Sequence, residues 1–173
     1  MFNIILSYSM KLRNLKASFI LKDKVCGEGN GKNYIFKRDG FTFTIYLHSP
    51  YLINVTGIKS FERLKLARGI IEEKLQKTIV KTRIDNTFFS QKNYRNIDLT
   101  QVYEFMQNNE DFHVDYNTEL FAGMYFKPKK LNYPTILFFR TGSYTMTVGK
   151  CMSKIMGCET LVNKLIRKFD KNP

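Results

Sequence analysis

The chain has 173 residues, which is enough for one ordinary domain with a sizeable core or for two small repeats that share one. Hydrophobic residues make up 43% of the sequence and aromatic residues 14%, a composition that excludes an intrinsically disordered protein. Lys and Arg number 28 against 15 Asp and Glu, so the net charge is +13 and polyanionic partners, chiefly nucleic acid, are favoured. A basic surface that serves only solubility is the alternative. An anionic membrane surface is disfavoured, because no long basic amphipathic helix stands out.

The sequence contains no run of about 18 consecutive apolar residues, so no membrane span is expected. The apolar run in MFNIILSYSMK is too short for a secretory signal, and its lysine follows the run instead of preceding it. We therefore expect an intracellular protein. The three cysteines, Cys26, Cys151 and Cys158, form no Cys-x-x-Cys pair, which predicts free thiols rather than a disulfide or zinc framework.

The first half of the chain is predicted to form four strands and one helix. Turn residues at Asp39-Gly40 and Ser49-Pro50 separate the later strands. The predicted strands cover Lys11–Leu21, Asn33–Arg38, Phe41–His48 and Tyr51–Thr56. Ser60 is a suitable N-cap for the helix, because an apolar stripe at helical spacing follows it. That stripe contains Phe61, Leu64, Leu66, Ala67, Ile70, Ile71 and Leu75.

The same order of elements is predicted again in the second half. Thr78–Ser90 resembles the first strand, and Asp98 caps a helix that ends near Gln107 and buries Leu99, Val102, Phe105 and Met106. A loop over Asn108–Thr118 comes next. Three strands are then predicted over Leu120–Lys127, Thr135–Arg140 and Ser143–Val148, with a two-residue turn at Thr141-Gly142. A helix over Ser153–Phe169, with a stripe of Ile155, Met156, Leu161, Val162, Leu165 and Ile166, ends the chain.

Alternation in the last three strands predicts a sheet with one face on the core and one face open. The open face would carry hydroxyl groups beside large apolar side chains, which is typical of a ligand-binding surface. Its predicted members are Thr135, Leu137, Phe139, Thr145 and Thr147.

The run ELFAGMYFKPKKLNYPTILFFRTGSYTMTVGK, from Glu119 to Lys150, closely resembles the second repeat of the TATA-box-binding protein family. Ala122 stands where the family has Pro, and Thr147-Val148-Gly149-Lys150 where it has Thr-Gly-x-Lys. The strand asparagines Asn14 and Asn86 occupy the same place in each half, so an internal repeat extends the resemblance to about residues 10–170.

The resemblance implies an α+β fold: a saddle of two pseudo-symmetric repeats, with a curved antiparallel sheet and helices on its convex face. The chain would be a single domain over residues 1–173, with repeat one at about 10–76 and repeat two at about 78–170. The implied function is that of a DNA-binding transcription initiation factor, which binds AT-rich promoter DNA in the minor groove and helps to assemble the pre-initiation complex. The implied partners are promoter DNA, a B-type initiation factor, the RNA polymerase machinery and, in a divergent member, a further protein subunit. The place of action would be a nucleus or a viral transcription site.

By the same resemblance, Asn14 and Asn86 bond base edges, Phe121 and Phe139 are wedges between base steps, and Thr56 and Thr147 lie on the floor of the interface. Lys59, Lys127 and Lys150 lie near phosphates. The complete set of expected DNA-binding residues is Asn14, Lys16, His48, Asn54, Thr56, Lys59, Asn86, Phe88, Phe121, Lys127, Thr135, Leu137, Phe139, Thr145, Thr147 and Lys150. Glu119 and Leu120 match the loop that contacts the B-type initiation factor, although Asn117 stands where a second glutamate is usual.

The first half departs from the family pattern. Phe139 lies eight positions before Thr147, but His48 lies eight positions before Thr56, so that wedge is missing. Its partner position falls near Gly31 or Lys32, which are not aromatic either. Lys16 and Phe88 replace small apolar residues beside the two asparagines, and the short loop Lys22–Gly31 leaves no room for the first repeat's usual helix. We therefore expect weaker, one-sided bending with more backbone contact from Lys16, Lys32, Lys37 and Arg38.

Two alternatives remain at the level of sequence. The fold could act as a protein-interaction scaffold with only non-specific DNA binding, or as an accessory domain of a nucleic-acid enzyme. No enzyme site is predicted, because His48 and His113 have no metal-ligand spacing with the cysteines and no G-x-S-x-G motif occurs. No cofactor is expected.

Overall fold

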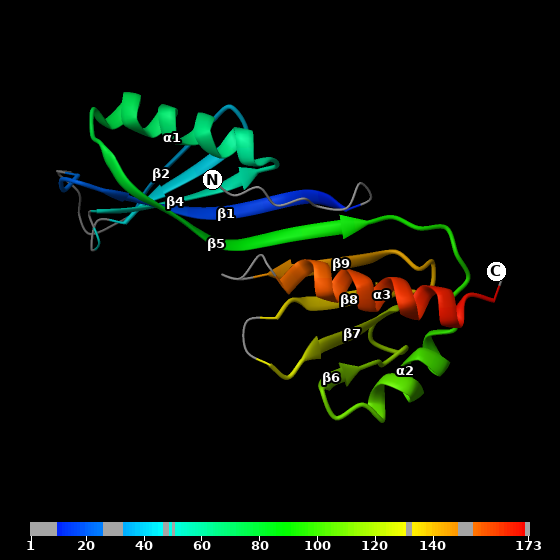
Figure 1. The fold of residues 1–173 in the computed structure, drawn as a ribbon. Coiled ribbons are helices and arrows are strands. Elements are labelled where there is room, and N and C mark those ends of the chain that lie inside the picture. The colour runs from blue at the N-terminus through cyan, green and yellow to red at the C-terminus, as the bar shows by residue number, and fades with distance from the viewer. Residues whose placement is uncertain are drawn as a thin grey trace. The chain divides into compact units, whose positions relative to one another are not determined.

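The computed structural model describes residues 10–25, 33–46, 49, 51–130, 133–148 and 154–171. These residues form two compact units. The N-terminal unit contains Leu12–Thr87, and the C-terminal unit contains the described residues from Phe88 onward together with Met10 and Lys11. Figure 1 shows the elements of both units, and the long strand β5 passes from one unit into the other.

The N-terminal unit is an antiparallel sheet with one helix. Its strands hydrogen-bond in the order β2-β3-β4-β1-β5. The elements are β1 (Lys11–Leu21), β2 (Tyr34–Arg38), β3 (Phe41–Ile45), β4 (Leu52–Ile58), α1 (Phe61–Leu75) and the first part of β5 (Ile79–Gln91).

Local sequence explains where these elements turn. Asp39 and Gly40 have positive φ angles of 52° and 79°, and the pair Arg38↔Phe41 closes a two-residue hairpin around them, as an Asp-Gly dipeptide predicts. The hydroxyl of Ser60 accepts a hydrogen bond from the amide of Arg63 at 3.3 Å, which confirms the predicted helix cap.

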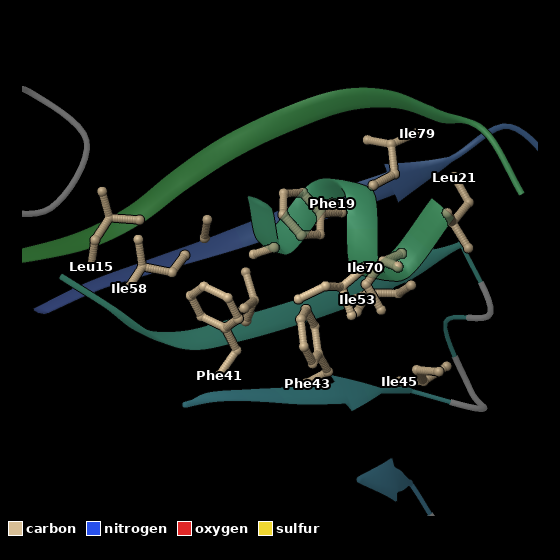
Figure 2. Close-up of a cluster of buried hydrophobic side chains, with 14 residues drawn as sticks. Leu15, Phe19, Leu21, Phe41, Phe43, Ile45, Ile53, Ile58, Ile70 and Ile79 are labelled. Carbon is tan, nitrogen blue, oxygen red and sulfur yellow. The ribbon is translucent and has the colours of Figure 1, made fainter. Parts of the chain in front are cut away.

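One face of the N-terminal sheet packs against α1 in a hydrophobic core (Figure 2). Every second residue of β3 and of β1 from Leu15 onward is buried there, β4 adds Ile53, Val55 and Ile58, and α1 adds Ala67, Ile70 and Ile71. Leu66 was predicted to belong to this stripe but is exposed, because its helical position is at the margin of the stripe formed by Ala67, Ile70 and Ile71. The opposite face of β1, β3 and β4 therefore carries the alternate residues of the same strands.

The C-terminal unit repeats the same plan. Its strands follow the order β5-β9-β8-β7-β6, and the pairs β6–β7, β7–β8 and β8–β9 are antiparallel. The elements are the end of β5, α2 (Leu99–Gln107), β6 (Phe112–Asp115), β7 (Gly123–Pro128), β8 (Thr135–Phe139), β9 (Tyr144–Val148) and α3 (Ile155–Phe169). Asp98 caps α2 as predicted, because its carboxylate accepts from the amides of Thr100 and Gln101.

Three predictions about this unit need correction. The loop predicted over Asn108–Thr118 contains strand β6, whose four residues are too few for a clear alternation to be recognised. The strand predicted from Leu120 begins at Gly123, because the residues before it form a turn on Asn117. The turn after β8 has three residues, since the amide of Phe139 donates to the carbonyl of Ser143 at 3.0 Å.

Two helical predictions are also wrong in detail. Met156 is exposed, and α3 buries Cys158 and Glu159 in addition to the predicted Ile155, Val162 and Leu165. Phe105 of α2 is partly exposed, with its ring against Phe169 and the ammonium group of Lys168 3.7 Å from its centroid. Within the described residues, no helix is long and apolar enough to cross a membrane.

Candidate nucleic-acid interface

The C-terminal sheet has one fully buried face and one partly open face. Ile136, Phe138, Tyr144, Met146 and Val148 are buried. The residues between them are partly exposed, and they are the five members of the predicted open face: Thr135, Leu137, Phe139, Thr145 and Thr147. The alternation in the sequence thus predicted the two faces of this hairpin correctly.

Strand register brings these five side chains into rows. Thr135 pairs with Thr147 and Leu137 with Thr145 across β8 and β9. On the other side of β8, Leu137 pairs with Tyr125 of β7, which adds an exposed aromatic ring to the same face. The described residues of these rows are therefore hydroxyl-bearing or apolar, and the exposed Lys127 of β7 lies at their margin, on the same side of the strand as Tyr125.

An aromatic pair ends this surface. The rings of Phe121 and Phe139 meet edge to face, with centroids 6.0 Å apart, and half of Phe121 is exposed (50%). Gly123 pairs with Phe139 across β7 and β8, and a Cβ at Gly123 would lie only 2.7 Å from Cε1 of Phe121. The absence of a side chain at Gly123 therefore makes room for the ring pair.

The turn before β7 holds the two predicted partner-binding residues. The amides of Leu120 and Phe121 donate to the carbonyl of Asn117, and the Asn117 side chain accepts from the amide of Glu119 at 3.0 Å. This turn exposes Glu119 and leaves 82% of Leu120 exposed. Asn117 thus shapes the turn, a role that its mismatch with the family pattern did not suggest.

The structure describes two of the three lysines that were predicted to contact phosphates. Lys127 is exposed in β7, opposite His113 of β6, and Lys59 is exposed just after β4. Lys150 and His48 lie outside the described residues, as do Gly31 and Lys32. Phe88 is exposed in β5 on the side opposite the buried Phe89.

The helix-free face of the N-terminal sheet differs in chemistry. Thr42 pairs with Thr56, and Thr44 with Asn54, across β3 and β4. Lys37 of β2 pairs with Thr42, so it shares this face. Lys16 is exposed between the buried Leu15 and Ala17 and also lies on the side away from the core.

The two predicted base-reading asparagines are both exposed, Asn14 in β1 and Asn86 in β5. The side-chain oxygen of Asn14 accepts a hydrogen bond from the amide of Gly57 at 3.2 Å. Its NH₂ group remains a donor, which is the group that an acceptor-rich base edge requires.

Sequence reasoning missed a row of polar side chains on the N-terminal face. Ser18 is fully buried, pairs with Asn54, and lies with its Oγ 2.7 Å from Oδ1 of that residue. The Ser18 hydroxyl also contacts the carboxylate of Asp85, and Asn54 Nδ2 lies 2.9 Å from the hydroxyl of Tyr46. Ser18 lies two residues after Lys16 and four after Asn14 in the same strand, so the sequence could have placed it on their face. The contact with Asp85 could not be predicted in this way, because it depends on how β1 and β5 pair.

No group of three or more His, Cys, Asp or Glu residues that could hold a metal ion occurs among the described residues. Burial raises the pKa of the Cys158 thiol to about 11. The pKa of Tyr144 is also raised, first by burial and then by the nearby carboxylate of Glu159. Both groups lie in the C-terminal core.

Comparison with known proteins identifies the family. The family model described as "Transcription factor TFIID (or TATA-binding protein, TBP)" matches residues 81–171, which is more than half of the chain. The chain belongs to the TATA-binding protein family. This is a family of DNA-binding transcription factors without enzymatic activity, so the prediction that the protein is not an enzyme is confirmed.

A solved structure extends the similarity to both units. The TATA-binding protein of Methanococcus jannaschii superposes with a TM-score of 0.70 at 16% sequence identity, covering 92% of this chain and 99% of that one. The TATA-binding protein fold predicted from the sequence is therefore confirmed. No curated protein sequence matches this chain. The family match includes only residues 81–87 of the N-terminal unit, so most of that unit has diverged in sequence while keeping the fold.

Proposed function

We propose that this TATA-binding protein family member is a transcription initiation factor that binds AT-rich promoter DNA in the minor groove and helps to assemble the pre-initiation complex. The observation that carries the proposal is the Phe121–Phe139 ring pair, with Phe121 half-exposed, at the end of a sheet face of hydroxyl and apolar groups. The net charge of +13 supports a polyanionic partner.

The chemistry of the C-terminal face suits an A·T minor groove. That groove presents only the acceptors of adenine N3 and thymine O2, so a reader needs apolar contacts and a few hydroxyl or amide donors. Thr145, Thr147 and Leu137 provide such a surface, and its centre has no carboxylate to repel the acceptors. Exposed aromatic rings at its end can enter a base step, which costs about a few kcal/mol per step and is offset by the larger contact with bent DNA.

The other predicted residues take supporting roles in this proposal. Asn14 and Asn86 donate to base edges. Thr56 and Thr147 lie on the floor of the interface, and Thr135, which pairs with Thr147, contacts DNA beside it. Lys59, Lys127 and Lys150 neutralise phosphates. We assign Lys16, His48, Asn54 and Phe88 to the same interface, and we propose that the whole chain is one domain of two repeats.

The exposed turn at Glu119 and Leu120 is the proposed contact for a B-type initiation factor, through which the polymerase machinery would be recruited. A largely exposed leucine beside a carboxylate provides an apolar anchor with a charged neighbour. A nucleus or a viral transcription site is the proposed place of action.

The test is binding of the full chain to end-labelled duplexes, AT-rich against GC-rich, followed by fluorescence transfer across a salt series. Transfer between the ends reports bending, and the slope of affinity against salt counts the phosphates that are contacted. Preferential binding of the AT-rich duplex with a shortened end-to-end distance is expected. Equal binding of both duplexes with a steep salt slope and no bending would contradict promoter recognition.

That second outcome would favour the alternative, a protein-interaction scaffold with only non-specific DNA binding. The exposure of Leu120 is the observation that favours it, because a large apolar side chain in water is typical of a protein contact. Glu119→Ala and Leu120→Ala would then be compared for loss of initiation-factor binding, with DNA binding as the control.

A further inference from the structure

The helix-free faces of the two units differ in their hydrogen-bonding groups. The C-terminal face is apolar and hydroxyl-bearing, as described above. On the N-terminal face, a row of polar side chains runs across four adjacent strands: Thr44 in β3, Asn54 in β4, Ser18 in β1 and Asp85 in β5. The row ends in a carboxylate, which is an acceptor only.

The proton of Ser18 shows how this row is polarised. A serine hydroxyl has one proton, and Ser18 Oγ contacts both Asn54 and Asp85. A carboxylate is the stronger acceptor, so the proton points toward Asp85. The amide of Asn54 lies between Ser18 and Tyr46, and its oxygen and nitrogen can exchange places. Its NH₂ group can therefore donate to Ser18 Oγ while its oxygen faces Tyr46.

Asp85 keeps accepting capacity after these contacts. A carboxylate offers about four lone-pair sites. One site takes the Ser18 hydroxyl, and a second takes Nε of Arg83, which lies 2.7 Å from Oδ1. The side chain of Asp85 is 19% exposed, so it is close to the surface but largely removed from water.

An acceptor in this position is unfavourable against an A·T pair and favourable against a G·C pair. The minor-groove edge of A·T presents only acceptors, which would face the carboxylate with no proton between them. The edge of G·C adds the amino group of guanine N2, which is a donor. Against A·T, the remaining accepting sites of this partly desolvated carboxylate would face other acceptors, which costs free energy, whereas a charge-assisted hydrogen bond from the amino group of guanine is favourable.

Positive side chains near the row allow DNA to approach the carboxylate of Asp85. Arg83 pairs directly with Asp85, and Lys16 and Lys37 lie on the same face at its margins. These cations offset the repulsion between Asp85 and the phosphates that flank a minor groove.

We propose that Asp85, positioned by Ser18, is a specificity-determining residue that accepts a hydrogen bond from a purine 2-amino group in the minor groove. The N-terminal unit would then select a G·C pair, while the C-terminal unit selects A·T. This inference rests on the proposed minor-groove binding, and it makes the preferred DNA site chemically asymmetric.

The experiment uses the full chain and a set of duplexes that differ by one minor-groove amino group. Each A·T pair of an AT-rich site is replaced in turn by diaminopurine·T, which adds only that amino group, and each G·C variant is compared with inosine·C, which lacks it. We expect one position, in one half of the site, where the amino group improves affinity by about five- to tenfold. At that position, Asp85→Asn should reduce the gain to about twofold or less, since an amide can turn its donor end toward the base.

Glu104→Gln is the matched control, because it also changes a carboxylate to an amide but lies exposed on α2. It should leave the amino-group preference unchanged. Ser18→Ala tests positioning: it should reduce the gain, and the thermal unfolding temperature of each variant shows whether the fold survives. If Asp85→Asn does not fold, Ser18→Ala serves as the variant, and an amino group that weakens binding of the unmodified protein at every position still overturns the proposal.

The outcomes separate this proposal from the broader one. An amino group that weakens binding at every position, with AT-rich binding and bending retained, would overturn the role of Asp85 and leave minor-groove binding intact. Loss of all preference for AT-rich over GC-rich duplexes, with no bending, would remove the minor-groove interface itself. An equal amino-group gain in Asp85→Asn and in the unmodified protein would assign the preference to another residue.

Discussion

The ring of Phe121 packs edge to face on the ring of Phe139, with 63° between the two planes. Phe121 comes from the turn before β7 and Phe139 is the last residue of β8. The contact places two aromatic side chains that are 18 residues apart at one end of the same open face. Edge-to-face packing holds an exposed ring in a defined orientation, which lowers the entropy cost of inserting it between bases.

Replacing either phenylalanine should therefore reduce bending more than it reduces folding stability. Phe121→Ala is expected to weaken binding to an AT-rich duplex by about tenfold and to produce a smaller decrease in the end-to-end distance of the bound duplex. The unfolding temperature should change little, because half of the ring is already exposed. Phe139→Ala should have the same effect on DNA and an added stability loss of about 1–2 kcal/mol from its partly buried ring. Tyr94→Ala, at a highly exposed aromatic residue, is the control, and an equal effect there would contradict the wedge role.

Gly123→Ala tests the space beneath the ring pair. The added Cβ would lie 2.7 Å from Phe121 Cε1, 3.0 Å from Phe139 Cε1 and 3.2 Å from Leu137 Cδ1, so these side chains must move. We expect a stability loss of about 1–2 kcal/mol and a bending defect similar to that of Phe121→Ala. Gly69→Ala in α1 is the control: apart from the adjoining backbone of α1 and its chain neighbours, nothing lies within 4 Å of its added Cβ, so stability should rise by about 1 kcal/mol with bending unchanged. Normal bending by Gly123→Ala would show that the ring positions do not matter.

The sequence predicts the C-terminal unit well for a local reason. Strands β8 and β9 adjoin in the chain, so alternation along each strand and a short turn between them determine which side chains share a face. Strand β6 was missed because four residues at a sheet edge carry little periodic signal. Leu66 and Met156 are exposed, which shows that periodicity predicts the centre of a buried helical stripe but not which residues at its edges are buried.

The polar row of the N-terminal unit could not be predicted in the same way. Ser18 and Asn54 are 36 positions apart, and Ser18 and Asp85 are 67 apart, so their contacts depend on the register of three strands from different parts of the chain. A bulge between Leu15 and Ala17 also shifts the register of β1 against β4. Family resemblance gave no help, because the chain departs from the family in this half.

Lys127 should contribute to binding through phosphate charge and not through sequence preference. Lys127→Gln is expected to weaken AT-rich and GC-rich binding to a similar degree and to reduce the magnitude of the salt slope by about one. Lys65→Gln makes the same charge change on the exposed side of α1, away from the sheet face. Affinity measured over a salt series decides the matter. If both variants change the slope equally, net charge rather than a local contact at Lys127 explains the effect.

Asp98 should make part of the fold's stability dependent on pH. The ammonium group of Lys171 and the amide of Gln101 lower the pKa of the Asp98 carboxyl from its ordinary value of 3.8. The ionised carboxylate is thus favoured in the folded state, so its stabilising effect is present above the ordinary pKa and is lost as pH falls through the folded value. Asp98→Asn should therefore lower the unfolding temperature at pH 7, and the difference should shrink below about pH 4.

The control for Asp98 is Asp115→Asn, at an exposed residue of the edge strand β6. Unfolding temperatures of the three proteins across pH test the assignment. A difference between the unmodified protein and Asp98→Asn that stays constant from neutral to acid pH would mean that the negative charge of the carboxylate does not contribute to stability. No difference at pH 7 would mean that the carboxylate acts only as a helix cap, which asparagine also provides.

Cys158 should be unreactive while the C-terminal unit is folded. Burial raises the pKa of its thiol from 9.0 to about 11, so at pH 8 the thiolate fraction falls about a hundredfold relative to an unperturbed cysteine. Site-resolved alkylation should show slow labelling of Cys158 in the native protein, an increase of about tenfold per pH unit toward pH 10, and fast labelling in denaturant. The residue lines a cavity of about 290 Å³ with Phe112 and Leu161, so access alone does not exclude a small reagent. Labelling at pH 8 that is equally fast in the native and denatured protein would show that the thiol is neither buried nor held protonated.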